Sequence, residues 1–409
     1  MNNSPQFERI KAGLGKRRRA EKRFRFFGIA AISAGLLFLA VMFALVAVKG
    51  AGAFQRTLVQ VEVFFDPELA KDGDYAGMVK ASLRKAFPEV QERNDKRRLY
   101  KLVSIGAAFD LRRMILDDPE IVGETRTVWV PASDDVDIAV KGNVSPRLGK
   151  RQHIWIASLK GTGRLKTEFN TAFFTSGDSR EPELAGIATA LMGSLFSILV
   201  CLALAFPLGV MAAVYLEEFA AKNRWTELIE VNINNLAAVP SIVFGLLGLA
   251  VFLNFFHLPR SAPLVGGMVL ALMTLPTIII AGRAALKAVP PSVREAALSV
   301  GASPLQAVLH HTLPLAMPGV LTGAIIGLAR ALGETAPLLM IGMVAFIVDI
   351  PKNILDPATA LPVQVFLWAD SPERAFEEKT AAAILALLVF LICMNLLAVA
   401  LRRKFEIRW

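Results

Sequence analysis

The sequence is poor in charge and in cysteine for a chain of its length. Only 20% of its 409 residues are charged, whereas 54% are hydrophobic and the mean hydropathy is +0.50. Soluble globular domains carry about 25% charged residues, so this balance is typical of an integral membrane protein. The two cysteines, Cys201 and Cys393, both lie in apolar runs, which argues against a disulfide framework, a cysteine metal site and redox chemistry.

The motifs of a nucleotide-binding or catalytic chain are also missing from the sequence. The phosphate-loop pattern Gly-x-x-x-x-Gly-Lys-Ser/Thr occurs nowhere. His310 and His311 are adjacent and would diverge on a helix, so a shared metal is not expected. Glu217 and Glu218 end an apolar run and are expected to be interface anchors rather than acid-base catalysts. We therefore expect a chain that is no enzyme and binds no cofactor or metal; any ATP hydrolysis would come from a separate subunit.

Long apolar runs are what the sequence has instead. A helix of about 20 apolar residues crosses a hydrocarbon core roughly 30 Å thick. Pro207 and Pro337 lie inside the two longest runs, where each helix is expected to tilt or kink. The expected fold is therefore an all-α membrane protein with six transmembrane helices, over residues 27–48, 185–215, 234–256, 263–282, 318–348 and 380–401.

The distribution of basic residues gives the expected orientation. Nine Lys or Arg residues and two Glu residues occupy the segment 1–26, and the tail 402–409 is also basic. By the positive-inside tendency both termini are cytoplasmic, which six crossings allow. The net charge of +10 comes largely from these flanks, so nucleic-acid binding is not expected. We expect a multi-pass protein of the cytoplasmic (inner) membrane.

Residues 49–184 differ from the rest of the chain and are expected to form a water-exposed domain outside the membrane. This segment holds 22 Lys or Arg residues and 20 Asp or Glu residues, over half of the charge of the chain. Lys160-Gly-Thr-Gly-Arg164 is interpreted as a hairpin turn rather than a phosphate cradle. Residue spacing and type predict an α+β domain, with helices around 75–87 and 99–116 and strands at 125–131, 136–141, 153–159 and 164–174.

The first apolar run has two interpretations. Ala51-Gly-Ala53 resembles a signal-peptidase site, which would mean that the run is cleaved off. However, the run 27–48 has 22 residues, longer than the usual core of a signal peptide of about 7 to 15 residues. An uncleaved first transmembrane helix is the favoured interpretation.

The connection at 283–317 is too elaborate for a simple loop. Pro290-Pro291 stops the preceding helix, and Ser292-Val-Arg-Glu295 has the form of a capping box that begins another. Gly301 would end that helix, Ser303-Pro304 would begin a second, and Pro314 and Pro318 would end the unit. The apolar residues of these two short helices exceed what a solvated loop needs, so a partner is expected to cover them.

The residues of this loop match a family pattern. Glu295-Ala296-Ala297-x-x-x-Gly301, followed after nine residues by x-x-Leu313-Pro314, resembles the EAA loop of permease subunits in type I ABC importers, although His311 occupies a position that is usually aliphatic. Two further segments, 235–248 and 329–339, resemble the phosphate-importer permeases of the A-subunit type. The resemblance covers the permease core at 185–401 and implies that the loop couples this chain to an ATPase.

The resemblance also implies partners. These are a homologous second permease subunit, a dimer of ATP-binding cassette ATPases that uses the ATP, an extracytoplasmic phosphate-binding protein, phosphate itself and membrane lipid. The domain at 49–184 lies outside the matching region as an N-terminal extension. Docking the binding protein or the partner permease is a role that would suit it.

Arg330 and Glu334 are the sharpest chemical feature inside an apolar run. A charge at this depth is costly unless it is paired or faces a wet cavity. The i, i+4 spacing allows the two to pair, and a guanidinium suits an oxyanion. Gly333 and Pro337 are expected to disturb the helix, with a restart after Thr335. We therefore expect Arg330, Glu334 and Thr335 to line a substrate pathway, the alternative being a structural ion pair.

Other functions stay open at this point. Sulfate and molybdate permeases use a similar Arg-Ala-Leu-Gly-Glu core, although the Glu334-Thr-Ala-Pro337 continuation favours phosphate. An ATPase-independent transporter would leave the EAA loop without a purpose. A membrane-anchored sensor would explain the domain at 49–184, but the cytoplasmic segments are too short to hold a signalling domain.

Overall fold

The protein is described here from a computed structural model that covers residues 5–142, 146–344 and 346–405. The chain divides into two units, Met1–Lys49 and Gly50–Trp409. The first unit holds nearly all of one continuous helix, α1 (Pro5–Gly50). Its apolar part, within Arg17–Phe54, is long enough to cross a membrane.

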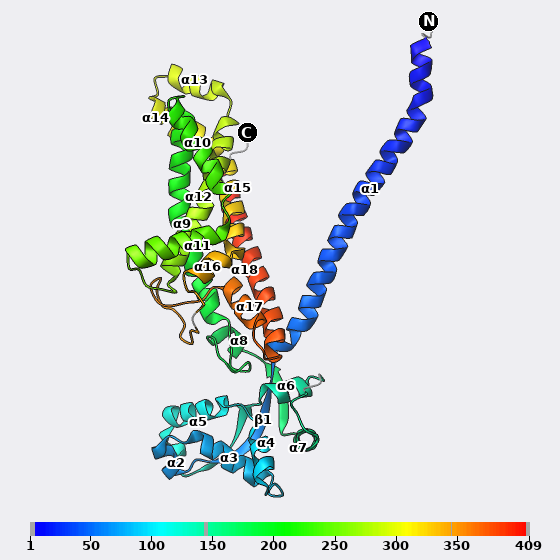
Figure 1. Cartoon of the computed structure of the whole chain (residues 1–409), viewed down its shortest axis with the longest axis vertical. Helices are drawn as coiled ribbons and strands as arrows, with labels where there is room; N and C mark the ends of the chain where they lie inside the picture. The colour runs from blue at the N-terminus through cyan, green and yellow to red at the C-terminus, as the bar shows by residue number, and fades with distance from the viewer. Residues whose placement is uncertain (1–4, 143–145, 345, 406–409) are drawn as a thin grey trace. The chain divides into compact units, whose positions relative to one another are not determined.

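The second unit begins with a small α+β domain, which we call the inserted domain and define as residues 55–169. Its sheet has the order β2-β1-β3, with β1 (Gln55–Phe64) antiparallel to both β2 (Thr125–Pro131) and β3 (Leu165–Phe169). Apolar residues of β1 pack against the surrounding helices in one core. These helices, shown around β1 in Figure 1, are α2 (Pro67–Asp72), α3 (Tyr75–Ala86), α4 (Arg93–Tyr100), α5 (Gly106–Asp117), α6 (Asp134–Val140) and α7 (Lys150–Gly161).

Several expectations for this domain are confirmed and several are wrong. The helix at 75–87 and the strand at 125–131 are confirmed by α3 and β2, and the helix expected over 99–116 is confined to α5. The strands expected at 136–141 and 153–159 are wrong, because α6 and α7 occupy them. Strand β1 lies in a segment for which no strand was expected.

The segment Lys160–Arg164 is not a hairpin turn, because it links a helix to a strand. Helix α7 ends at Gly161, and Gly163 has a φ of 71°, the left-handed conformation that favours glycine at a helix end. Strand β3 begins at Leu165 and ends at Phe169, so the strand expected over 164–174 is about half as long as predicted. The short helix α8 (Ala172–Thr175) follows it.

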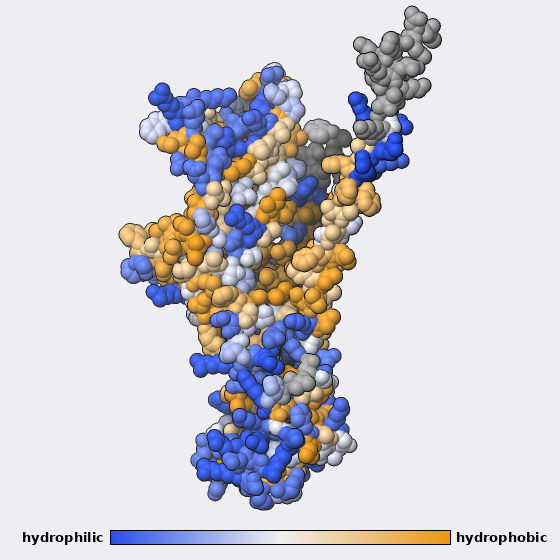
Figure 2. All heavy atoms as spheres, turned by 45° about the vertical axis from the view of Figure 1, so that its right-hand side comes forward, coloured by the Kyte–Doolittle hydropathy of each residue, from blue (hydrophilic) through white to orange (hydrophobic). Residues whose placement is uncertain are grey.

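The rest of the second unit is a bundle of apolar helices, which we call the permease core. Helix α12 (Pro263–Lys287) lies between α9 (Ala188–Val214) and α15 (Leu313–Gly333), with α18 (Ala375–Phe405) packed against α15. Small residues allow this close packing: a Cβ on Gly323 of α15 would lie 2.2 Å from that of Ala281. Figure 2 shows an apolar surface over these helices and a hydrophilic surface over the inserted domain.

The expected count of six membrane spans depends on how one bent pair of helices is counted. Five described helices are long and apolar enough to cross, and a sixth span exists if α10 (Arg224–Ala237) and α11 (Ser241–Gly248), with the π-helical Leu249–Phe255, count as one. That pair is bent by 101°, and the break between Ala237 and Ser241 falls inside the span expected at 234–256. Asn235 and Ser241 lie on either side of the break, which ends at Pro240.

The span expected over 318–348 is also interrupted. Helix α15 ends at Gly333, and a separate turn, α16 (Ala336–Met340), follows after Glu334 and Thr335. The expected disturbance of the helix and its restart after Thr335 are therefore confirmed. Pro337 explains the break, because its ring fits the first turn of a helix but not the interior. Helix α17 (Leu361–Ala369) then leads to α18.

Candidate functional site

Arg330 and Glu334 lie together at the end of α15. Arg330 Nε is 3.4 Å from Glu334 Oε1, a long contact for a charged hydrogen bond. The Arg330 side chain is 48% exposed and that of Glu334 is 19% exposed. A Cβ on the neighbouring Gly333 would have no heavy atom within 4 Å among the described residues. The pair is therefore loosely held and faces open space.

The segment that follows Glu334 is held in place by packing against α11 and by backbone hydrogen bonds. Pro337 and Leu338 of α16 are buried. Helix α11 packs on α16 so closely that a Cβ on Gly245 would lie 2.7 Å from the Cα of Pro337. Thr335 O accepts hydrogen bonds from Leu338 N at 3.1 Å and Leu339 N at 3.0 Å. Thr335 is thus tied into the backbone of this turn, while Arg330 is left to reach outward.

The expected coupling loop forms two short helices at one end of the permease core (Figure 1). Helix α13 (Pro291–Ser299) is followed by Gly301, whose φ of 91° requires glycine, and by α14 (Pro304–Ala307). The expected start of α14 at Ser303-Pro304 is confirmed. Ser303 also forms a capping box that was not expected: Ser303 Oγ accepts from Gln306 N at 3.3 Å, and Gln306 Oε1 accepts from Ser303 N at 2.9 Å.

Two other expectations for the loop are wrong. Helix α13 begins at Pro291 with Pro290 at the N-cap, so Ser292 does not cap it. Pro314 and Pro318 do not end the unit, because the chain runs through a π-helical turn, Val308–Thr312, into α15. Pro314 is the second residue of α15, directly after this π-helical turn.

The EAA residues are divided between surface and interior. Glu295, Ala296 and Gly301 are exposed, Leu313 and Pro314 are half-buried, and Ala297 is buried. Four apolar side chains of the loop are also largely exposed, namely Leu298, Val300 (83% exposed), Leu305 and Leu309. This surface is the one for which the sequence predicts a covering partner.

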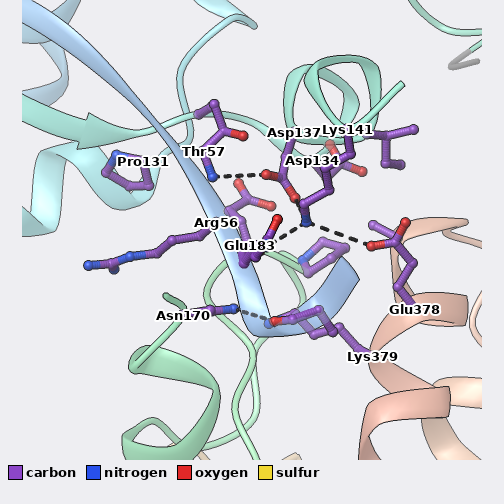
Figure 3. Close-up of a pocket in the computed structure, with 16 residues that line it drawn as sticks. Arg56, Thr57, Pro131, Asp134, Asp137, Lys141, Asn170, Glu183, Glu378 and Lys379 are labelled. Carbon is purple, nitrogen blue, oxygen red and sulfur yellow. Dashed lines mark hydrogen bonds and ion pairs between the residues drawn. The ribbon is translucent and has the colours of Figure 1, made fainter. Parts of the chain in front are cut away.

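A second polar site joins the inserted domain to the beginning of α18 (Figure 3). We call it the junction and define it by Asp137, Lys141, Glu183, Glu378 and Lys379. Lys141 Nζ donates to Gly52 O at 2.7 Å and Gln55 O at 2.9 Å, pairs with Asp137, and lies 3.7 Å from Glu378 Oε2. Asp137 Oδ1 in turn accepts from Thr57 N at 2.9 Å.

The junction is largely shielded from solvent and lines a cavity of about 30 Å³, enough for a water molecule. Lys379 is 5% exposed and donates to Ala185 O. Glu183 Oε2 is buried without a hydrogen-bond partner in the part of the chain that the structure describes. The pKa of Glu183 is raised to about 7, chiefly by burial and also by the nearby carboxylates of Asp134 and Glu181, while a hydrogen bond with Ser104 opposes the shift.

Sequence reasoning missed the junction. None of these residues stands out in the sequence, where Lys141 and Glu183 belong to the segment 49–184 that is expected to be water-exposed. The available indication was weak: Glu183 and Lys379 each lie within a few residues of an apolar run. Their proximity depends on how α18 packs against the chain before α9, which residue spacing does not reveal.

A family described as "Binding-protein-dependent transport system inner membrane component" matches residues 205–407. A family described as "Domain of unknown function (DUF3333)" matches residues 11–150.

Several curated relatives are permeases. The phosphate transport system permease protein PstA 1 of Mycobacterium tuberculosis (strain CDC 1551 / Oshkosh) is 33% identical over 218 residues, which cover 53% of this chain and 70% of that protein. PstA of Haemophilus influenzae is 29% identical over 223 residues, 54% of this chain and 78% of its own length. PstA of Yersinia pestis is 32% identical over 213 residues, with coverages of 52% and 71%.

Proposed function

Because the chain belongs to the family of phosphate transport system permease proteins, we propose that it forms half of the translocation pathway of an ATP-driven phosphate importer. It is a permease subunit of the inner membrane, and ATP hydrolysis belongs to a separate ATPase. The observation that supports a pathway role most directly is the exposed, loosely paired Arg330 at the broken end of α15.

In this proposal Arg330 attracts the anion and Glu334 limits how tightly it is held. A guanidinium is permanently charged and offers several N–H donors to an oxyanion. A fully unpaired Arg in a dry site would trap a multivalent anion, whereas an Arg shared with Glu334 can release it. The 3.4 Å contact supports such sharing, because it leaves the remaining guanidinium donors to a ligand. Thr335 supports the pair by fixing the turn that follows it.

The coupling loop is the proposed connection to the motor. Glu295, Ala296, Ala297, Gly301, Leu313 and Pro314 would form the ATPase-coupling element, with the exposed apolar residues of α13 and α14 seated on an ATPase. ATP-driven closure of an ATPase dimer would then move this loop and alternate access to the pathway. A homologous second permease would supply the other half, and an extracytoplasmic binding protein would deliver phosphate. Both termini would face the cytoplasm and the inserted domain the outside.

Transport measurements test this function. The chain, its partner permease, the ATPase and the binding protein are reconstituted in lipid vesicles. Uptake of radiolabelled phosphate, sulfate and molybdate is compared with and without ATP, and with and without the ATPase. We expect ATP-dependent uptake of phosphate that excess sulfate does not inhibit. Preferred uptake of sulfate or molybdate would reassign the substrate. Phosphate uptake that continues without the ATPase would contradict the importer mechanism.

A further inference from the structure

One arginine of the coupling helix connects it to two long helices of the permease core. Arg294 of α13 donates from Nε to Glu218 Oε2 at 2.8 Å, and its Nη2 also contacts the Glu218 carboxylate. Glu218 belongs to the π-helical segment Tyr215–Phe219 that ends α9. The same guanidinium donates to Leu286 O at 3.0 Å and Val289 O at 3.1 Å, at the end of α12.

This contact is mostly shielded from solvent. The Glu218 side chain is 7% exposed and that of Arg294 is 24% exposed, so solvent screens the pair only weakly. The planar fork of arginine can bind a carboxylate with two donors and still reach two carbonyls, which a lysine ammonium cannot reproduce. Terminal carbonyls of a helix also have no partner within the helix, and Arg294 supplies one for α12.

A second arginine extends the connection. Arg283 of α12 donates to Glu217 Oε2 at 3.3 Å and to Glu230 Oε1 of α10 at 2.7 Å. The adjacent residues Glu217 and Glu218 therefore each bind a different arginine. We call this cluster of Glu217, Glu218, Glu230, Arg283 and Arg294 the arginine hub. It joins α9, α10, α12 and α13.

We propose that Arg294 is a positioning residue that transfers movement of α13 to α9 and α12. The arginine hub would thereby transmit the ATP-driven conformational change of the ATPase to the permease core. This inference rests on the proposed function, since it requires α13 to be the element that the ATPase moves. Ser299, another polar residue of α13, bonds only within the helix: its Oγ donates to Glu295 O at 2.7 Å and to Ala296 O at 3.0 Å.

The competing route is apolar contact. Val293 of α13 packs against a cluster that includes Val289, Val308 and Ala316. If this packing transmitted the movement, the hub would only stabilise the fold. Replacement of Arg294 by lysine separates the two routes, because lysine keeps the positive charge and leaves Val293 in place but loses the fork.

The first test uses the whole importer in vesicles and compares Arg294→Lys with the control Arg224→Lys, an exposed arginine at the start of α10. We expect Arg294→Lys to lower phosphate uptake per ATP hydrolysed about tenfold, the factor that corresponds to one lost charged hydrogen bond. ATPase activity and co-purification of the ATPase are expected to stay within about twofold, a change small enough to leave docking intact. Unchanged uptake per ATP in Arg294→Lys would overturn the proposal, as would loss of the ATPase from the complex.

The second test needs neither phosphate nor ATPase and so separates this inference from the proposed function. Spin labels at the exposed positions 222 and 292, in a chain with Cys201 and Cys393 replaced by alanine, report the distance between the loop after α9 and α13. We expect a narrow distance distribution in the otherwise unchanged chain and a clearly broader one with Arg294→Lys, at equal folded yield. Glu218→Gln, which keeps one acceptor oxygen, is expected to give an intermediate width. Identical distributions in all three chains would refute the hub as a rigid connection.

Discussion

At position 330 a permanent charge stands at the end of an apolar helix with a carboxylate four residues away. We expect Arg330→Gln to lower phosphate uptake about ten- to a hundredfold, because the glutamine amide loses the charge that strengthens hydrogen bonds to an oxyanion. Uptake by the reconstituted importer measures the change. The matched control is Arg260→Gln, an exposed arginine in the connection between α11 and α12. Full transport by Arg330→Gln would exclude the pathway role.

Replacement of Glu334 distinguishes a role of the Arg330–Glu334 pair in the substrate pathway from a purely structural role. If Glu334 limits how tightly the anion is held, Glu334→Gln should lower both KM and kcat, because the anion binds better and leaves more slowly. A structural ion pair predicts a different outcome, namely a lower folded yield with unchanged KM. Initial rates of uptake over a range of phosphate concentrations, together with the yield of folded protein, distinguish the two.

Glu183 gives the junction a predictable pH dependence. Its pKa is raised to about 7 in the folded protein, from an ordinary value of 4.5, so the folded state holds the proton more tightly than the unfolded chain. Stability from this group is complete below the unfolded pKa and is lost as the pH rises to about 7, on the order of 2 kcal/mol for this partly exposed side chain. Glu183→Gln should flatten this part of the curve. Melting temperatures at pH 5 to 8 measure it; parallel curves for both proteins would contradict the assignment.

At the scale of helices and strands, local pattern predicted some elements and failed for others. Helix α3 and strand β2 carry clear periodicity, and Ser303-Pro304 begins α14 as its capping chemistry dictates. The segments of α6 and α7 are rich in Val, Ile and Trp and were mistaken for strands. In α7 the buried residues Trp155, Ile156 and Leu159 follow helical spacing. Their packing in the core of the inserted domain therefore outweighs the preference of Trp and Ile for strands.

Some residues of the candidate site could be predicted from the sequence, and others could not. Arg330, Glu334 and the EAA residues were found because a charge in an apolar run and a spaced motif are both visible in the sequence. The arginine hub and the junction were missed because they join residues far apart in the chain: Arg294 to Glu218, and Lys141 to Glu378. Only the packing of α9, α12 and α18 brings these groups together.

The contact between Lys141 and the start of β1 is expected to protect the backbone amides of β1 from hydrogen exchange. Lys141→Met keeps much of the side-chain length but removes the donor to Gly52 O and Gln55 O and leaves Asp137 without this cation. We expect amide exchange in β1, including Thr57 N, to become about tenfold faster or more, because the local opening energy falls with the lost charged hydrogen bonds. Hydrogen-exchange mass spectrometry of the full chain measures it. Lys150→Met, at an exposed position of α7, is the control, and equal exchange in both variants would contradict the role of Lys141.

For the molecule as a whole, the inserted domain has ends that lie side by side. Gln55 pairs with Phe169 across the sheet, and Asn170 bonds to both Ala53 O at 3.0 Å and Phe54 O at 2.8 Å. Residues after this point belong to the permease core, since Phe173 is fully buried in a cluster with Trp368 and Phe376. A deletion that ran to 175 would therefore damage the permease, whereas one that ends at 168 would spare it.

We expect the permease to fold and insert when residues 56–168 are replaced by a short Gly-Ser linker, because the retained ends are already adjacent and their closure costs little entropy. Loss of the inserted domain also removes Lys141, whose Nζ lies 3.7 Å from Glu378 Oε2, so Glu378→Gln is added in a second version to remove the charge of this half-buried carboxyl group. If the domain docks the binding protein, the deleted importer should keep its ATPase activity but lose affinity for that protein and take up phosphate more slowly at low binding-protein concentration. Titration of the binding protein against uptake measures this. Unchanged affinity and uptake would reject the docking role and leave the inserted domain as a support for α18.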